Sequence, residues 1–147
     1  MYDKTKIEEK VNEFCKKGEL YDYRDIILKI FEDIVKKGCW IYPVEIYGDE
    51  KSSHQINGTY CHIEISLKSN QYSNPLDIIW TILHEFGHHL SGLPNGKEMS
   101  IERERQAWDL GQKILNDFPK LKVKEKDFEK FRDACLINYI KYNQQLL

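Results

Sequence analysis

The stretch "NPLDIIWTILHEFGHHLSG", residues 74–92, combines a complete helix pattern with a dense cluster of metal-binding side chains. It opens with Asn74 and Pro75, which favour the N-cap and the first helical position, and it ends at Gly92, which favours a left-handed turn. Its apolar residues recur at three- and four-residue spacings, so the sequence predicts one amphipathic helix across this stretch.

Three of the five histidines of the chain lie in "HEFGHH", residues 84–89. On a helix, His84 and His88 share one face one turn apart, and this spacing is typical of a zinc site. His89 points about a hundred degrees away from His88, and His54 lies in a polar loop, so neither is expected to be a ligand. The alternative is that the motif histidines are surface residues or are satisfied within the core.

A third ligand is needed, because a catalytic zinc usually takes three protein side chains and leaves a fourth position for water. The next predicted helix, residues 99–117, offers Glu102 and Glu104 on different faces. Glu104 falls on the apolar face, where an unpaired carboxylate is costly, whereas Glu102 shares its face with polar residues. The sequence therefore predicts that Glu104 binds a cation, and a buried Glu104–Arg ion pair is the alternative. The apolar face comprises Ile101, Ala107, Trp108, Gly111 and Leu115.

The remaining pattern predicts an α+β fold in one domain, residues 1–147. Two amphipathic helices cover residues 4–17 and 21–37, and both end at "KKG" with Gly18 or Gly38 in a left-handed turn. Strands at residues 40–47 and 59–68, with an Asn57-Gly58 turn signal, predict a small antiparallel sheet packed on the helices. A last helix carries Phe128, Phe131, Cys135 and Tyr139, after a helix that ends at Pro119.

Composition excludes several classes of function. The 147 residues are 41% hydrophobic and 31% charged with a net charge of −2, so no overall field recruits nucleic acid or an anionic membrane. The tract Lys120–Lys126 is interpreted as a solvated connector, with a phosphate site as the alternative. The opening residues have no signal-peptide pattern and the apolar run at residues 75–86 is too short to span a bilayer, so we expect a cytoplasmic protein. The four scattered cysteines are expected as thiols, with two disulfides as the alternative.

"HEFGHHLSG" followed by "ERQAWDLG" resembles the ImmA/IrrE family of zinc metallopeptidases, whose active-site helix commonly reads His-Glu-Leu-Gly-His. The second segment fits that family's Glu-x-x-Ala-x-x-Phe-Ala helix except at its last two positions, and the family's usual Leu-Leu-Met-Pro ending is missing. The similarity covers about residues 56–115. It implies a zincin-like minimal metallopeptidase fold, with Zn²⁺ held by His84, His88 and Glu104, and Glu85 as the catalytic base.

The resemblance also implies a protein or peptide substrate, such as a repressor of a mobile element or stress pathway. The predicted chemistry is metal-assisted hydrolysis of an amide. Tyr60 and His62, on the polar face of the strand that borders the cleft in such peptidases, are candidate donors to the oxyanion, with ordinary strand packing as the alternative. Trp80 and Trp108 either wall the site or belong to the core. Two other functions remain open: a catalytically silent metal-binding protein that binds a partner, and a zinc hydrolase of a non-peptide amide.

Overall fold

The computed structural model describes residues 3–44, 53–57, 60–69, 72–92 and 101–145. The chain divides into two compact units, Met1–Ile82 and Leu83–Leu147, and the boundary falls inside helix α3 (Leu76–Leu90). We call them the N-terminal unit and the C-terminal unit. The single domain expected over residues 1–147 stays a prediction.

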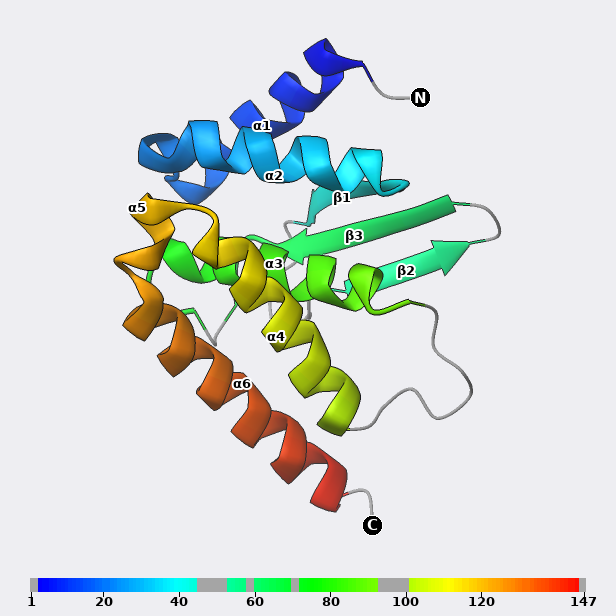
Figure 1. Ribbon diagram of the computed structural model, residues 1–147, viewed down its shortest axis with the longest axis vertical. Helices are drawn as coiled ribbons and strands as arrows, with labels where there is room; N and C mark the ends of the chain where they lie inside the picture. Colours follow the sequence, from blue (N-terminus) through cyan, green and yellow to red (C-terminus); the bar gives the residue numbers. More distant parts are fainter. Residues whose placement is uncertain (1–2, 45–52, 58–59, 70–71, 93–100, 146–147) are drawn as a thin grey trace. The chain divides into compact units, whose positions relative to one another are not determined.

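The N-terminal unit begins with α1 (Lys4–Gly18), the short 3-10 helix η1 (Tyr21–Tyr23) and α2 (Arg24–Lys36), as Figure 1 shows. The Asp3 side chain caps α1 by accepting a hydrogen bond from the Lys6 N–H at 2.9 Å. The left-handed residue after α1 is Glu19, with φ 58°, so the prediction of Gly18 was wrong. Gly18 is instead confined by packing, because an added Cβ would lie 3.0 Å from Ile78 Cδ1. Gly38 does take the predicted positive φ, 80°.

In the part of the chain that the structure describes, the sheet has three strands, β1 (Cys39–Val44), β2 (Ser53–Asn57) and β3 (Tyr60–Ser66), in the order β1-β3-β2. β2 pairs antiparallel with β3. β1 pairs parallel with β3, with Trp40 opposite His62, so the predicted antiparallel pairing of these two strands was wrong. The reason is that β2 lies between β1 and β3 in the sequence. β2 runs opposite to both strands, so β1 and β3 run in the same direction. The backbone of His54 lies in β2, where a polar loop was predicted.

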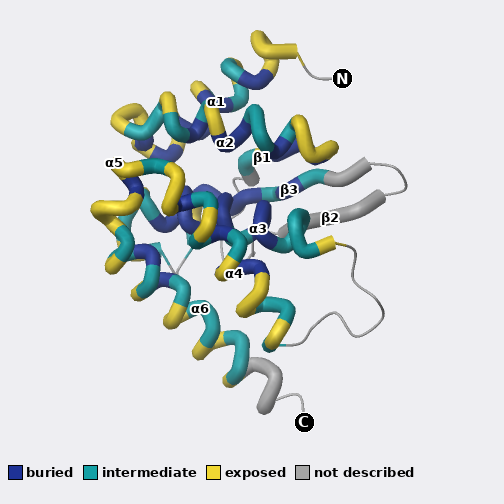
Figure 2. Tube along the Cα trace, viewed as in Figure 1, coloured by how far each residue is buried: buried dark blue, intermediate teal, exposed yellow. Residues whose placement is uncertain are grey.

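The core of the N-terminal unit follows the predicted periodicities. Ile63 and Ile65 of β3 are fully buried, whereas His62 and Glu64 between them are part-exposed, so the predicted alternation is confirmed there. Phe14 of α1 meets Phe31 of α2 edge-on, with ring centroids 5.1 Å apart. Figure 2 shows buried stretches of α1, α2 and β3 in dark blue. The buried stripe of α2 consists of Ile27, Ile30, Phe31 and Ile34.

Helix α3 begins and ends as predicted. Asn74 Oδ1 accepts a hydrogen bond from the Leu76 N–H at 2.9 Å, and Asp77 Oδ2 accepts one from the Ser73 N–H at 2.6 Å. The helix ends before Gly92, whose φ is 93°. These caps leave the His-Glu-x-x-His motif on the last two turns of a regular helix.

The C-terminal unit continues from α3 with α4 (Ile101–Asn116), α5 (Pro119–Lys122) and α6 (Glu125–Gln145). α6 packs against α4, and Figure 1 shows it running back alongside that helix. The tract Lys120–Lys126, predicted to be a connector, forms α5 and the first turn of α6. Pro119 therefore starts a helix as well as ending one, and Leu121 is fully buried while the lysines of the tract are exposed.

Within the described part of the chain, no helix is long and apolar enough to cross a membrane. Among the described residues, Cys15, Cys39 and Cys135 are not in disulfide bonds, which agrees with the prediction of thiols at these three positions. The side chain of Cys61 lies outside the described residues.

Candidate metal centre

The last two turns of α3 bring three potential metal ligands together. The nitrogen atoms of His84 and His88 and a carboxylate oxygen of Glu85 all lie within 4.8 Å of one another. The two imidazole rings have centroids 4.6 Å apart and are inclined by 61°. The four-residue spacing has thus produced the predicted shared face, and this group could hold a metal ion.

Helix α4 adds Glu104 to the same group. Its Oε2 lies 2.6 Å from His88 Nε2 and 3.2 Å from His84 Nε2. The side chains of Glu104 and the two histidines are only 19%, 16% and 16% exposed, whereas Glu102 is exposed to solvent. The predicted orientation of the two glutamates is therefore confirmed. In the described part of the chain, Glu104 makes its ion pairs with these histidines, not with an arginine.

Two glycines allow α3 and α4 to approach closely enough for these contacts. A Cβ added to Gly87 would lie 2.0 Å from the carbonyl oxygen of Ala107, a distance that no real Cβ tolerates. A Cβ added to Gly111 would lie 3.0 Å from the Leu83 carbonyl oxygen. The backbones of the two helices are thus nearly in contact beside the histidines. The Arg103 Nη2–H also donates to the Gly92 carbonyl oxygen at 3.0 Å, which ties the end of α3 to the start of α4.

The donor set fits a zinc ion. Zinc–nitrogen and zinc–oxygen bonds of about 2.0–2.2 Å in a tetrahedron place ligand atoms about 3.3–3.5 Å apart. The two distances from Glu104 Oε2 to the imidazole nitrogens, 2.6 and 3.2 Å, fall short of this spacing by less than 1 Å. Two imidazoles and one carboxylate are also the ligand types that borderline-soft divalent zinc takes in catalytic sites. These three side chains could therefore surround the ion after a small outward movement.

The charges at the site suit a cation. Burial lowers the pKa of His84 and so favours the neutral imidazole that binds metal. Burial alone would raise the pKa of Glu104, but hydrogen bonds from His84 and His88 and their charges lower it below its usual range. Glu104 is accordingly an ionised carboxylate. A metal ion would need an unprotonated ring nitrogen from each histidine, so its binding competes with protons.

Glu85 has a different environment. The residue is only 4% exposed, and burial together with the charge of Glu104 raises its pKa well above the usual range for a carboxyl group. A nearby divalent cation would reverse this effect by stabilising the ionised form. Glu104 Oε2 lies within 3.2 Å of the Nε2 atoms of both histidines, so Glu104 could also serve as a metal ligand.

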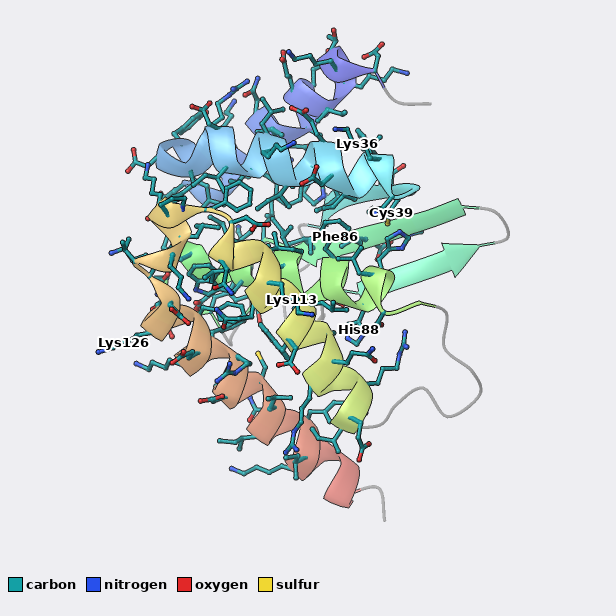
Figure 3. The ribbon with its side chains drawn as sticks, in the orientation of Figure 1. Lys36, Cys39, Phe86, His88, Lys113 and Lys126 are labelled. Atoms are coloured by element: carbon teal, nitrogen blue, oxygen red, sulfur yellow. The ribbon has the colours of Figure 1, made fainter. Side chains whose placement is uncertain are left out.

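Aromatic residues pack against the histidines. Trp108 of α4 stacks on His84 with ring centroids 4.2 Å apart and an interplanar angle of 8°. This contact agrees with the prediction that Trp108 walls the site. His88, labelled in Figure 3, lies one turn further along α3. His89 stacks loosely on Phe86, with centroids 6.4 Å apart, and is not part of the ligand group.

The other predicted site residues belong to the N-terminal unit. His62 lies 3.4 Å from Glu64 Oε1, and its ring meets Tyr42 edge-on with centroids 5.7 Å apart. Tyr60 starts β3, and its side chain lies outside the described residues, as does that of His54. Trp80 is fully buried. A role for Tyr60 or His62 in stabilising an oxyanion stays a prediction.

The close approach of α4 to Gly87 was not predicted from the sequence. The sequence did contain an indication, because Gly87 lies inside a predicted helix. Glycine there destabilises the helix by about 1 kcal/mol relative to alanine, so its presence indicates that close packing excludes a larger side chain. The structure shows this close packing against the Ala107 carbonyl group.

No protein-family model, curated protein or solved structure matches this chain.

Proposed function

We propose that this chain is an intracellular zinc-dependent endopeptidase that hydrolyses a peptide bond in a protein target. The observation that carries the proposal is the position of Glu104, whose carboxylate faces both imidazoles of the His-Glu-x-x-His helix at 2.6 and 3.2 Å. A two-histidine, one-carboxylate set with a buried glutamate beside it is the donor arrangement of hydrolytic zinc sites. The sequence resemblance to ImmA/IrrE peptidases supports the same class and makes a repressor a candidate target.

In this proposal His84, His88 and Glu104 hold the zinc ion. When bound, the ion supplies Lewis-acid activation of water and of the scissile carbonyl group. The Glu85 carboxylate accepts a proton from the attacking water. It then delivers that proton to the nitrogen of the leaving amine. Its burial keeps competing bulk water away from the proton that it carries.

The test compares Glu85→Gln with a matched control, Glu102→Gln. Glutamine keeps the shape of Glu85 but cannot accept the proton, and general acid–base groups typically contribute 10²–10⁴-fold to rate. We expect Glu85→Gln to bind zinc with an affinity within about threefold of the wild type and to lose at least about 99% of cleavage. Glu102 is exposed, so its variant should retain both properties.

Cleavage would be followed by mass spectrometry on denatured casein and on candidate repressors, with zinc or with a chelator. Undiminished cleavage by Glu85→Gln would refute its role as the base. Zinc binding without cleavage of any substrate would favour the catalytically silent metal-binding protein.

A further inference from the structure

The rings of His84 and Trp108 are stacked on one another. The two rings are nearly parallel, with an angle of 8° and centroids 4.2 Å apart, and Trp108 is only 2% exposed. One face of the His84 imidazole is therefore covered by the indole. The ring cannot rotate about its last side-chain torsion without losing this contact.

A metal-binding imidazole needs such support. The last torsion of histidine is broad, so the ring plane is not set by the backbone. In most metal sites a hydrogen bond to the second ring nitrogen orients the ring. Among the described residues, the hydrogen-bond partner of the His84 side chain is Glu104, and that bond engages His84 Nε2 and the same Glu104 oxygen that His88 Nε2 contacts. In this part of the chain, the remaining ring contacts of His84 are with Trp108 and His88.

Trp108 is itself held by α6. Phe128 and Phe131 meet its ring edge-on, with centroids 5.6 and 6.0 Å away and ring angles of 67° and 77°. Phe128 is fully buried and Phe131 is 8% exposed. Edge-to-face pairs of this kind restrict the position of a ring beyond simple burial. A continuous aromatic series therefore runs from α6 through Trp108 to His84.

We propose that Trp108, supported by Phe128 and Phe131, is a positioning residue that fixes the imidazole plane of His84 for metal binding. Contact with the indole face orients the imidazole ring, as a hydrogen bond to the second imidazole nitrogen does in other metal sites. This inference rests on the proposed metal site. It adds that α6, which contributes no ligand, determines metal affinity and the ligand geometry.

The experiment measures zinc affinity by competition with a chromophoric chelator and ligand geometry by the visible absorption spectrum of the cobalt(II) form. Trp108→Leu removes the flat face, whereas Trp108→Phe keeps a smaller one. Changes to supporting residues of metal ligands typically cost 10–100-fold in affinity, so we expect a loss of about that size for Trp108→Leu and an altered cobalt spectrum. Trp108→Phe should recover most of the affinity and a spectrum close to that of the wild type.

Leu115→Ala is the matched control, because Leu115 is fully buried on the same face of α4, two turns away from Trp108. It should destabilise the fold while leaving zinc affinity within about threefold, since it does not support a ligand. If Trp108→Leu does not fold, Phe131→Leu replaces it, with an expected loss of about 3–10-fold in affinity from the looser indole.

The outcomes separate this inference from the proposed function. Wild-type affinity and an unchanged cobalt spectrum in Trp108→Leu, or in Phe131→Leu where that variant replaces it, would overturn the positioning role while leaving the metal site intact. An equal loss of affinity in Leu115→Ala would also overturn it, because the effect would then be general destabilisation. A wild-type protein that binds neither zinc nor cobalt would contradict the metal site itself.

Discussion

Glu102 and Glu104 lie two residues apart on α4, yet they have opposite environments. Glu104 faces two imidazole nitrogens and Glu102 faces solvent. This difference was predictable from sequence, because a helix turns about 200° in two residues and only one of the two positions shares the apolar face. The distances were not predictable, because they depend on how closely the backbones of α3 and α4 approach.

The two glutamates therefore make a paired prediction. Glu104→Ala should lower zinc affinity by at least about a hundredfold, because it removes one of the three proposed zinc ligands. Glu102→Ala should leave zinc affinity unchanged and alter the free energy of unfolding by about 0.5 kcal/mol or less. Zinc titration and urea unfolding of both variants provide the measurements. A loss of zinc in Glu102→Ala with retention in Glu104→Ala would mean that the assigned face of α4 is wrong.

At the scale of the elements, the helices were more predictable than the sheet. The bounds of α3 follow from Asn74 and Gly92, because caps and periodicity are local signals. The pairing of β1 with β3 is not local: its direction depends on β2, whose polar sequence gave no strand signal. α5 was missed for a related reason, since proline ends one helix and equally begins the next.

The crossing of α3 and α4 depends on Gly87. Gly87→Ala would place a Cβ 2.0 Å from the Ala107 carbonyl oxygen, so the helices must separate. Overpacking typically costs about 1–3 kcal/mol, which outweighs the gain of about 1 kcal/mol in helix propensity. We expect net destabilisation and weaker zinc binding, because the separation carries Glu104 away from the histidines.

Gly111→Ala is the control for this prediction, because it adds a Cβ to the same helix crossing with a milder contact. Its Cβ would lie 3.0 Å from the Leu83 carbonyl oxygen, a much milder contact, so the change in unfolding free energy should stay within about 1 kcal/mol of zero. Urea unfolding with and without zinc measures both variants. Equal or greater stability and wild-type zinc affinity in Gly87→Ala would contradict the close crossing.

At the scale of the whole molecule, all three proposed ligands lie in the C-terminal unit, Leu83–Leu147. A ligand that binds only the folded state stabilises it by about 2.7 kcal/mol at a concentration a hundred times its dissociation constant. We therefore expect zinc to slow amide hydrogen exchange most in residues 83–92 and 101–116, and less in α1 and α2. Hydrogen-exchange mass spectrometry with and without zinc measures this difference. Protection confined to α1 and α2 would place the metal elsewhere.

In the proposed site, two histidines and a carboxylate, and no cysteine, hold one zinc ion. X-ray absorption at the zinc edge of the protein loaded with one equivalent of zinc tests this claim most directly. The predicted spectrum shows nitrogen and oxygen neighbours at about 2.0–2.2 Å with the outer-shell scattering of two imidazoles. A sulfur neighbour at about 2.3 Å would contradict the claim, because it would show that one of the thiols, not Glu104, completes the site.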